Sequence, residues 1–352
     1  MSNEPAFSGH QNSTAPRAIL FGCAGEMPSA AERSFFAEAD PLGFILFQRN
    51  CRAPDQVRAL VGELRACVGR ADAPVLIDQE GGRVARLKPP HWRRYPTAAR
   101  LAALPDAAAA VRLAARLIAD DLAALGVTVD CAPVLDLPVP SADGVIGDRA
   151  YGAEPAAVAR LGRAVCDGLL DGGVLPVIKH IPGHGRAQVD SHHALPVVDA
   201  DAALLEATDF APFRALSDMP WAMTAHVVYS AIDDTRPATS SRTVIDDVIR
   251  GAIGFDGMLV SDDIGMGALA GTIGERVAAA LEAGCDAALH CSGRLAEMHE
   301  AAEAASRLTP EAAARVARGE ALRRASWRAF DREEAEMRFD RLVGAPMGAR
   351  AG

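Results

Sequence analysis

The sequence predicts an α/β protein that folds into a single (β/α)8 barrel of the TIM type. Short apolar, strand-like runs alternate with Ala-, Leu- and Arg-rich helical stretches along the chain, which is typical of parallel βαβ units. Eight such runs can be counted, the number of strands in a (β/α)8 barrel. The 352 residues would also allow two domains, but no linker or repeat divides them. We expect the catalytic barrel and a C-terminal helix over residues 17–342, between flexible ends at 1–16 and 343–352.

Each expected strand is an apolar run. In chain order these runs are Ala18–Gly22, Gly43–Phe47, Ala73–Asp78, Val127–Asp136, Leu175–His180, Trp221–Val227, Gly257–Asp263 and Cys285–Cys291. The helical stretches have apolar residues three and four positions apart, as on one face of a helix. They are Pro54–Val68, Ala107–Leu125, Pro155–Leu170, Ile273–Ala283 and, after the last strand, Pro310–Ala329.

Charge and patterning exclude several classes of protein. The formal net charge of -10 and the pI of about 5.4 provide no basic field for a nucleic-acid backbone. Residues 1–16 lack the charged and apolar regions of a secretory signal. Charged residues interrupt the apolar stretch Ala107–Leu125, so we expect no membrane span. The sequence predicts a cytoplasmic protein, expected to be a monomer, with neither nucleic acid nor membrane as a partner.

Polar residues gather at the ends of the expected strands. These residues are Asp78, Lys179, His180, His226, Asp262 and Asp263. In a parallel barrel the C-terminal strand ends open on one face, where the βα loops build the active site. Because burying charged groups without a partner costs free energy, we expect a functional site there.

The seventh strand presents two carboxylates, Asp262 and Asp263, after an apolar run. A carboxylate fixed at a strand end suits nucleophilic attack on an anomeric carbon, because it can form and later release a glycosyl ester. From the pattern alone, the alternative that these aspartates cap the next helix or bind a metal has about equal weight.

The loop after the fifth strand, KHIPGHGRAQVDSHHALP, contains four histidines. Gly183 and Gly185 leave its backbone free to adopt conformations closed to other residues. Asp190 and His192 are two positions apart, so in an extended segment they lie on one side, where the carboxylate can orient the imidazole. This pair is a candidate general acid/base.

Four segments in this order carry a specific resemblance: LIDQEGGRVARL, APVLDL followed by GDRAYG, the histidine-rich loop, and GMLVSDDIGMGAL. The chain resembles the glycoside hydrolase family 3 β-N-acetylhexosaminidases of bacterial cell-wall recycling. The similarity spans roughly Ala18–Cys291, and the K-H-x-P-G-H-G…D-S-H loop is its most specific part.

The resemblance implies that Asp262, and not Asp263, is the nucleophile of a retaining mechanism. It also implies that His192, assisted by Asp190, protonates the leaving oxygen and later activates water. A histidine has an ordinary pKa of about 6.5 and can transfer protons at neutral pH without the raised pKa that a glutamate needs. Because this group is neutral beside the glycosyl-enzyme, phosphate is hypothesised to compete with water as the acceptor.

The same resemblance implies sugar-binding roles for Asp78, Arg86, Arg149, Lys179 and His180. A buried ion pair between Lys179 and Asp78 across the barrel mouth is the alternative for those two residues. We expect structural support from Arg83, ordering of the loop by His184 and His193, and a supporting role for His226.

The activity that the resemblance implies is removal of terminal non-reducing N-acetylglucosamine from cytoplasmic muropeptide fragments, without a cofactor or a metal. A β-glucosidase or another exo-glycosidase of the family and an N-acetylglucosaminide phosphorylase are alternatives. A metal-dependent hydrolase is disfavoured, because no H-x-H follows strand one and no H-E-x-x-H occurs. A non-catalytic sugar-binding barrel would require the loss of Asp262, Asp190 or His192, and all three are present.

Overall fold

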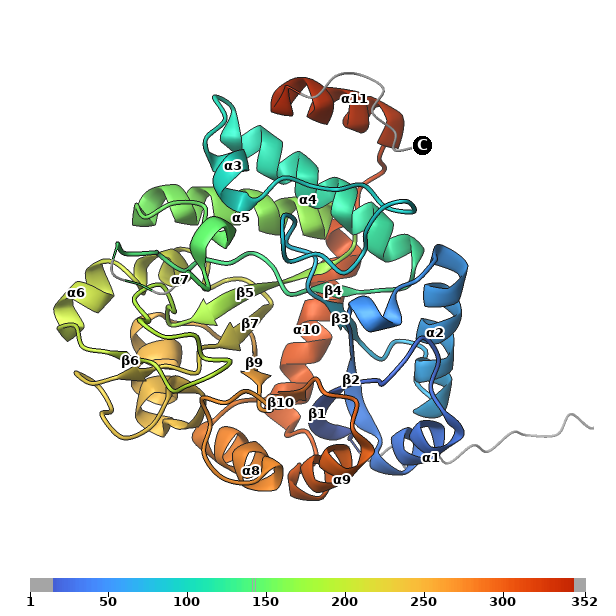
Figure 1. Ribbon diagram of the computed structural model, residues 1–352, viewed down its shortest axis with the longest axis vertical. Helices are drawn as coiled ribbons and strands as arrows, with labels where there is room; N and C mark the ends of the chain where they lie inside the picture. The colour runs from blue at the N-terminus through green and yellow to red at the C-terminus, as the bar shows by residue number, and fades with distance from the viewer. Residues whose placement is uncertain (1–14, 141, 143, 345–352) are drawn as a thin grey trace, which may run out of the picture.

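The computed structural model describes residues 15–140, 142 and 144–344. Within them, eight parallel strands close a barrel in the order β1-β10-β9-β7-β5-β4-β3-β2 (Figure 1). The strands are β1 (Arg17–Gly22), β2 (Pro41–Leu46), β3 (Val75–Ile77), β4 (Val129–Asp130), β5 (Leu175–Ile181), β7 (Trp221–Thr224), β9 (Met258–Asp263) and β10 (Ala287–His290). The two short strands β6 (Val197–Val198) and β8 (Val228–Tyr229) pair outside the barrel. The expected barrel fold is confirmed, and each expected run overlaps with one barrel strand.

Helices surround the barrel in Figure 1. They are α1 (Ala30–Ala39), α2 (Pro54–Cys67), α3 (Ala98–Ala102), α4 (Ala107–Ala124), α5 (Pro155–Asp171), α6 (Ala202–Ala207), α7 (Ala211–Ala215), the π-helical η4 (Val244–Ala252), α8 (Ile273–Ala283), α9 (Leu295–Ala304), α10 (Pro310–Ser326) and α11 (Arg332–Val343). Short 3-10 turns are η1 (Gln48–Asn50), η2 (Gly147–Arg149) and η3 (Ala238–Ser240). The five expected helical stretches correspond to α2, α4, α5, α8 and α10.

Side chains along the barrel strands alternate between two layers of the core. Leu20 of β1, Val177 of β5 and Val260 of β9 belong to the core inside the barrel. Phe21 and Ile178, one position later on their strands, pack between the barrel and the helices. This period of two follows from the pleat of a strand, and it determines which polar residues at the strand ends face the barrel axis.

One expected strand is much shorter than predicted. The run Val127–Asp136 was expected to be extended throughout, but β4 covers only two residues. Pro133 has no N–H to donate to a ladder, so the regular pairing stops before it. The chain nevertheless stays beside β5: the N–H of Lys179 donates to the carbonyl of Pro133 at 3.1 Å, and the N–H of Leu135 donates to the carbonyl of Lys179 at 2.7 Å.

Helix α11 was not expected as a separate element. It packs over α4, where Arg332 forms ion pairs of 2.8 Å with Asp120 and Asp121 (top of Figure 1). It includes Val343, and Gly344 ends it with a φ of 68°, so the predicted tail begins two residues too early. The rest of that tail and most of the predicted N-terminal segment lie outside the described residues.

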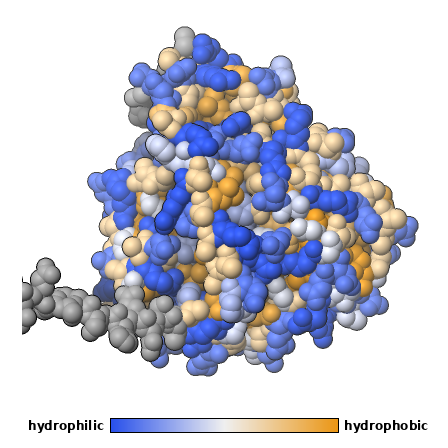
Figure 2. Space-filling view, turned by 180° about the vertical axis from the view of Figure 1, so that it is seen from behind, coloured by the Kyte–Doolittle hydropathy of each residue, from blue (hydrophilic) through white to orange (hydrophobic). Residues whose placement is uncertain are grey.

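None of the described helices combines the length and apolar character needed to cross a membrane. Figure 2 shows hydrophilic residues interspersed with apolar ones across one face of the molecule.

Candidate active site

The alternation along the strands directs three charged residues toward the barrel axis. Val177 of β5 and Val260 of β9 face the inside, so the next residues in phase are Lys179 and Asp262. Asp78 comes two positions after Leu76 of β3, which also faces the inside, so Asp78 points toward the axis as well. All three come at the C-terminal strand ends, as expected for the active-site face of a parallel barrel.

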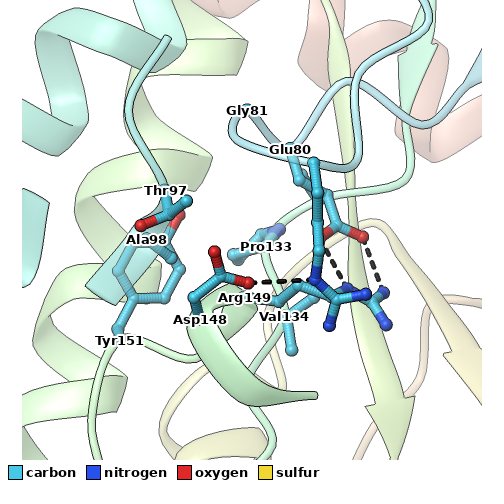
Figure 3. A pocket seen from close by; sticks show the side chains of 11 residues that line it. Glu80, Gly81, Thr97, Ala98, Pro133, Val134, Asp148, Arg149 and Tyr151 are labelled. Carbon is cyan, nitrogen blue, oxygen red and sulfur yellow. Dashed lines mark hydrogen bonds and ion pairs between the residues drawn. The ribbon is translucent and has the colours of Figure 1, made fainter. Parts of the chain in front are cut away.

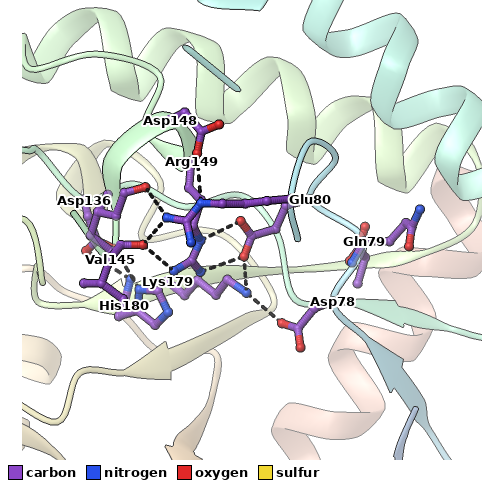
Figure 4. A network of polar contacts seen from close by, with 12 residues as sticks. Asp78, Gln79, Glu80, Asp136, Val145, Asp148, Arg149, Lys179 and His180 are labelled. Atoms are coloured by element: carbon purple, nitrogen blue, oxygen red, sulfur yellow. Dashed lines mark hydrogen bonds and ion pairs between the residues drawn. The ribbon is translucent and has the colours of Figure 1, made fainter. Parts of the chain in front are cut away.

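A buried network of ion pairs holds the predicted sugar-binding residues together (Figure 4). Lys179 Nζ lies 2.8 Å from Asp78 Oδ1 and 2.7 Å from Glu80 Oε1. Arg149 binds both carboxylate oxygens of Glu80, at 2.8 and 2.9 Å. Arg86 completes the network with a 3.0 Å ion pair to Asp78 Oδ2. The ion pair of Lys179 and Asp78, which the sequence offered as an alternative to sugar binding, is present as one part of a five-residue cluster.

These groups are charged at neutral pH. Burial by itself would raise the pKa of Asp78, but the positive charges of Lys179 and Arg86 lower it well below its usual range. The pKa of Glu80 is also lowered, because Lys179 and Arg149 outweigh its burial. Burial would lower the pKa of Lys179, yet the two carboxylates raise it above its usual value. The cluster therefore presents fixed charges to a ligand.

Sequence reasoning missed Glu80, although it lies within the DQEGGRVAR segment. The charges of the predicted sugar-binding residues could have pointed to it. Three of these residues, Arg86, Arg149 and Lys179, are cations, and Asp78 was the only carboxylate among them. Glu80 supplies the second anion and joins Lys179 to Arg149. Buried charges need partners, so a second acidic residue in the same segment was the candidate.

Asp136, at the end of the fourth expected strand, was also missed. It is fully buried, and its Oδ2 lies 2.7 Å from Nδ1 of His180. Its Oδ1 accepts the backbone N–H of His184 at 2.6 Å and that of His180 at 3.3 Å. Because a carboxylate accepts the Nδ1 proton, it fixes the tautomer of His180, whose Nε2 forms no hydrogen bond within the described residues.

Asp262 is held as an anion. Burial alone would raise its pKa, but electrostatic interactions with the imidazoles of His180 and His226, the hydrogen bond from the backbone N–H of Asp263 and the charge of Lys179 together lower it. The N–H of Asp263 donates to Asp262 Oδ1 at 2.8 Å. An ionised carboxylate at this position has the charge state that a nucleophile requires.

Asp263 has the opposite phase on β9 and different surroundings. Its Oδ1 accepts the N–H of Gly265 at 2.9 Å and the N–H of Cys291 at 3.2 Å. Burial raises its pKa, and the neighbouring charge of Asp262 adds to this rise. The carboxylate of Asp263 therefore holds the turn after β9; it does not cap the next helix, α8, whose N-cap is Thr272.

His226 supports the same turn. Its Nε2 lies 3.0 Å from the carbonyl oxygen of Asp263, and its Nδ1 lies 2.7 Å from Thr239 Oγ1. Burial lowers the pKa of His226, which favours the neutral ring. A neutral ring donates from Nε2 to the carbonyl and accepts from the threonine hydroxyl, which agrees with the expected supporting role.

The predicted acid/base pair is formed in the loop after β5. His192 Nδ1 lies 2.7 Å from Asp190 Oδ1, and the same oxygen accepts the backbone N–H of His192 at 2.9 Å. The side chains of His192 and Asp190 are 60% and 27% exposed. No hydrogen bond or ion pair joins His192 to Asp262 within the part of the chain described, but the N–H of Gly267 donates to the His192 carbonyl at 3.2 Å.

Arg83 lies beside the network without joining it. It binds Asp148 at 3.0 Å and donates to the carbonyls of Gly144, Val145 and Ile146. These contacts hold the loop that leads to Arg149, so Arg83 has the structural role expected. The pocket in Figure 3 lies between this loop, the Glu80–Gly81 turn and the start of α3.

A carboxylate held at a strand end of a barrel is the type of group that glycoside hydrolases use at the anomeric carbon. The chain belongs to glycosyl hydrolase family 3: the model of that family's N-terminal domain matches residues 22–319. The predicted family is thereby confirmed.

Several relatives share most of the chain. The β-hexosaminidase of Alkalilimnicola ehrlichii is 41% identical over 283 residues, which cover 78% of this chain and 80% of the relative. That of Pseudomonas aeruginosa is 35% identical over 86% of this chain and 90% of the relative. Among solved structures, NagZ from Neisseria gonorrhoeae with N-trifluoroacetyl-D-glucosamine is 31% identical, with a TM-score of 0.82 over 94% of this chain and 99% of that one.

Among the described residues, no three His, Cys, Asp or Glu side chains form a group that could hold a metal ion. Two of the charged groups at the strand ends, Asp78 and Lys179, are paired with each other.

Proposed function

We propose that this protein is a retaining exo-β-N-acetylglucosaminidase that removes terminal non-reducing N-acetylglucosamine. The observation that carries the proposal is the ionised, inward-facing Asp262 beside the network of Asp78, Glu80, Lys179 and Arg149. A carboxylate of this kind can attack an anomeric carbon, and fixed charges around a pyranose select its hydroxyl pattern.

In the first step, an oxygen of Asp262 forms a bond to the anomeric carbon while the bond to the leaving oxygen breaks. His192 donates its Nε2 proton to that oxygen, and Asp190 holds the ring through Nδ1. In the second step, His192 takes a proton from water, whose oxygen displaces Asp262 from the sugar. Two displacements at one carbon return the original β configuration.

The sugar-binding residues act before chemistry. Arg86, Arg149 and Lys179 offer donors, and Asp78 and the Nε2 of His180 offer acceptors, around the barrel axis. A sugar with another hydroxyl pattern would leave some of these buried groups without partners, which is the main source of discrimination. N-acetylglucosamine as the sugar is supported by the analogue in the N. gonorrhoeae structure and by a similar Paenibacillus protein, a β-N-acetylglucosaminidase that is 34% identical.

We further propose that the natural substrates are muropeptide fragments in the cytoplasm. The support is the match to cell-wall recycling enzymes in the four motif segments and the similarity to bacterial β-hexosaminidases along most of the chain.

The test compares two aryl sugars. The purified protein should release 4-nitrophenol from the N-acetyl-β-glucosaminide and hardly any from the β-glucoside. Comparable rates on both would favour the β-glucosidase alternative, and no release from either would leave only a sugar-binding barrel. The same reaction with added phosphate tests the acceptor, because N-acetylglucosamine 1-phosphate among the products would identify a phosphorylase.

A further inference from the structure

A buried serine separates the two members of the acid/base pair. Ser191 stands between Asp190 and His192 and is 3% exposed, although the histidine side chain beside it is 60% exposed. A short polar side chain that is buried between an exposed residue and a partly exposed one has a partner inside the protein. Ser191 is therefore the point at which this part of the loop enters the protein.

The side chain of Ser191 is linked to the sugar-binding site. Its Oγ lies 3.0 Å from Nε2 of His184, a buried residue. The backbone N–H of His184 donates to Asp136 Oδ1, and the other oxygen of Asp136 binds His180. A continuous chain of hydrogen bonds thus runs from the sugar-binding His180 to the residue between the acid/base partners. Burial, with the neighbouring imidazole of His180, lowers the pKa of His184 to about 4, so its ring is neutral at neutral pH.

The backbone at Ser191 is linked to the nucleophile's own loop. Its carbonyl accepts the N–H of Ala268 at 3.1 Å, and the His192 carbonyl accepts the N–H of Gly267 at 3.2 Å. A Cβ at Gly267 would lie 2.9 Å from the His192 oxygen and 3.1 Å from the His193 oxygen. Only glycine leaves room for this approach, and the contact joins the acid/base loop to the segment that follows Asp262.

We propose that Ser191 is a positioning residue for acid/base catalysis: its hydroxyl, held by His184, and its carbonyl, held by Ala268, place Asp190 and His192 for proton transfer. This inference rests on the acid/base role of His192 in the proposed function. Ser191 touches neither the substrate nor the reacting atoms. It keeps Asp190 and His192, which have few other contacts, in a fixed position relative to Asp262. Through His184 and Asp136 it also links that position to the sugar-binding site.

The experiment measures Ser191→Ala on two substrates that differ in their need for a proton. N,N′-diacetylchitobiose has a poor leaving group, whereas the 2,4-dinitrophenyl N-acetyl-β-glucosaminide has one that leaves without protonation. Because general acid catalysis contributes about 10²- to 10⁴-fold, we expect kcat/KM on the disaccharide to fall about 30-fold or more. On the activated substrate it should change by less than about threefold, since no proton transfer is needed there.

Azide provides a second signature. Loss of general base catalysis slows hydrolysis of the glycosyl-enzyme, and azide attacks without giving up a proton. With Ser191→Ala, azide should raise kcat on the activated substrate and yield the β-glycosyl azide. If Ser191 contributed only to folding, Ser191→Ala would lower kcat/KM equally on both substrates and would give no azide product.

Three variants make the outcome decisive. Thr309→Ala removes the N-cap hydroxyl of α10, near the Arg307 contact with the start of β1, and should produce no difference between the substrates. Gly267→Ala displaces the acid/base loop from the side of the segment that follows Asp262. It should give the same substrate difference and azide product even if Ser191→Ala does not fold. His184→Ala combined with Ser191→Ala should lose no more than either change alone, because both break one hydrogen bond.

His192→Ala distinguishes the proposed acid/base role of His192 from the proposed positioning role of Ser191. If it shows neither the substrate difference nor the azide product, the proposed acid/base role is wrong. If it shows both while Ser191→Ala and Gly267→Ala show neither, the positioning role of Ser191 is overturned and the proposed function stands.

Discussion

The proposed sugar-binding network and the proposed acid/base pair are built in opposite ways. Lys179 is 2% exposed and contacts two carboxylates, each of which has a second cation. His192 is 60% exposed and has one side-chain partner, Asp190. The network is fixed by several buried ion pairs from rigid strand ends, while the pair depends on hydrogen bonds within and beneath one loop.

The difference follows from what each region does. Recognition of a sugar depends on groups whose positions do not change when the substrate arrives, because reorganisation would cost binding free energy. A proton donor has to reach an oxygen on the far side of the bond from the nucleophile and later admit water. A loop held by few contacts is suited to that second task. Changes in the network should therefore affect binding and folding together, whereas changes in the loop should affect proton transfer.

The largest effect is expected at the nucleophile. Asp262→Asn removes the attacking charge while keeping the shape of the side chain, and turnover should fall on the order of 10⁴-fold or more. Asp263→Asn is the matched control, because that carboxylate faces the turn and an amide oxygen can still accept from Gly265. Steady-state kinetics on the aryl N-acetylglucosaminide measures both. Equal losses in the two variants would contradict the assignment of Asp262 from its phase on β9.

The next effect concerns the centre of the network. Lys179→Met leaves Asp78 and Glu80 in a buried site without their shared cation, which we expect to cost about 3–5 kcal/mol of unfolding free energy. Urea denaturation measures this loss, and kcat/KM should fall with it. Lys88→Met changes an exposed lysine that donates to Gln48, and it should leave both quantities nearly unchanged. If the Lys179→Met protein were as stable as the wild type, the ion pairs would contribute less to the unfolding free energy than their burial implies.

Glu80→Gln weakens the network without opening a cavity. One anion, Asp78, then remains for three cations, so Lys179 and Arg149 lose a charge-assisted partner each. Such bonds contribute about 1.5–3 kcal/mol, which corresponds to a fall of roughly 10- to 100-fold in kcat/KM if it is lost in the transition state. Glu333→Gln, on the exposed side of α11, is the control. An unchanged kcat/KM would mean that Arg149 is placed by its loop alone.

The sequence predicted the first region better than the second for a physical reason. Apolar runs identify barrel strands, and the period of two then directs Asp78, Lys179 and Asp262 inward without knowledge of any long-range contact. Glu80 follows the end of β3 in a turn, where no such period applies, and its partner Arg149 lies 69 residues away. Helices α1 and α9 were missed because short helices carry few turns of the apolar repeat.

The loop with Asp190 and His192 shows most clearly which contacts cannot be predicted from the sequence. Two-residue spacing was enough to pair Asp190 with His192, because that contact is local. The contacts of the loop with Gly267 and Ala268 join segments about 75 residues apart, and they depend on how two loops meet above the barrel. Backbone hydrogen bonds of this kind leave no mark in the sequence beyond a glycine, and many glycines have other causes.

The smallest effect on turnover is expected at Asp130, a buried carboxyl behind the network that lacks a cation. It is 1% exposed, its Oδ1 accepts the N–H of Gln79 at 2.9 Å, and its Oδ2 has no partner within the described residues. Burial raises the pKa of Asp130 to about 7, whereas an unfolded aspartate has a pKa of about 3.9. Between these values the folded protein binds more protons than the unfolded chain does.

Stability due to Asp130 is therefore fully present below pH 4 and is lost as the pH rises toward 7, the reverse of what Asp78 contributes. Asp130→Asn cannot ionise, so it should be more stable than the wild type above pH 7, by up to about 4 kcal/mol, and the advantage should shrink toward pH 4. Urea unfolding of both proteins at several pH values measures this difference. A constant difference across that range would mean that Asp130 stays ionised in the fold and that polar contacts, not protonation, satisfy its carboxyl.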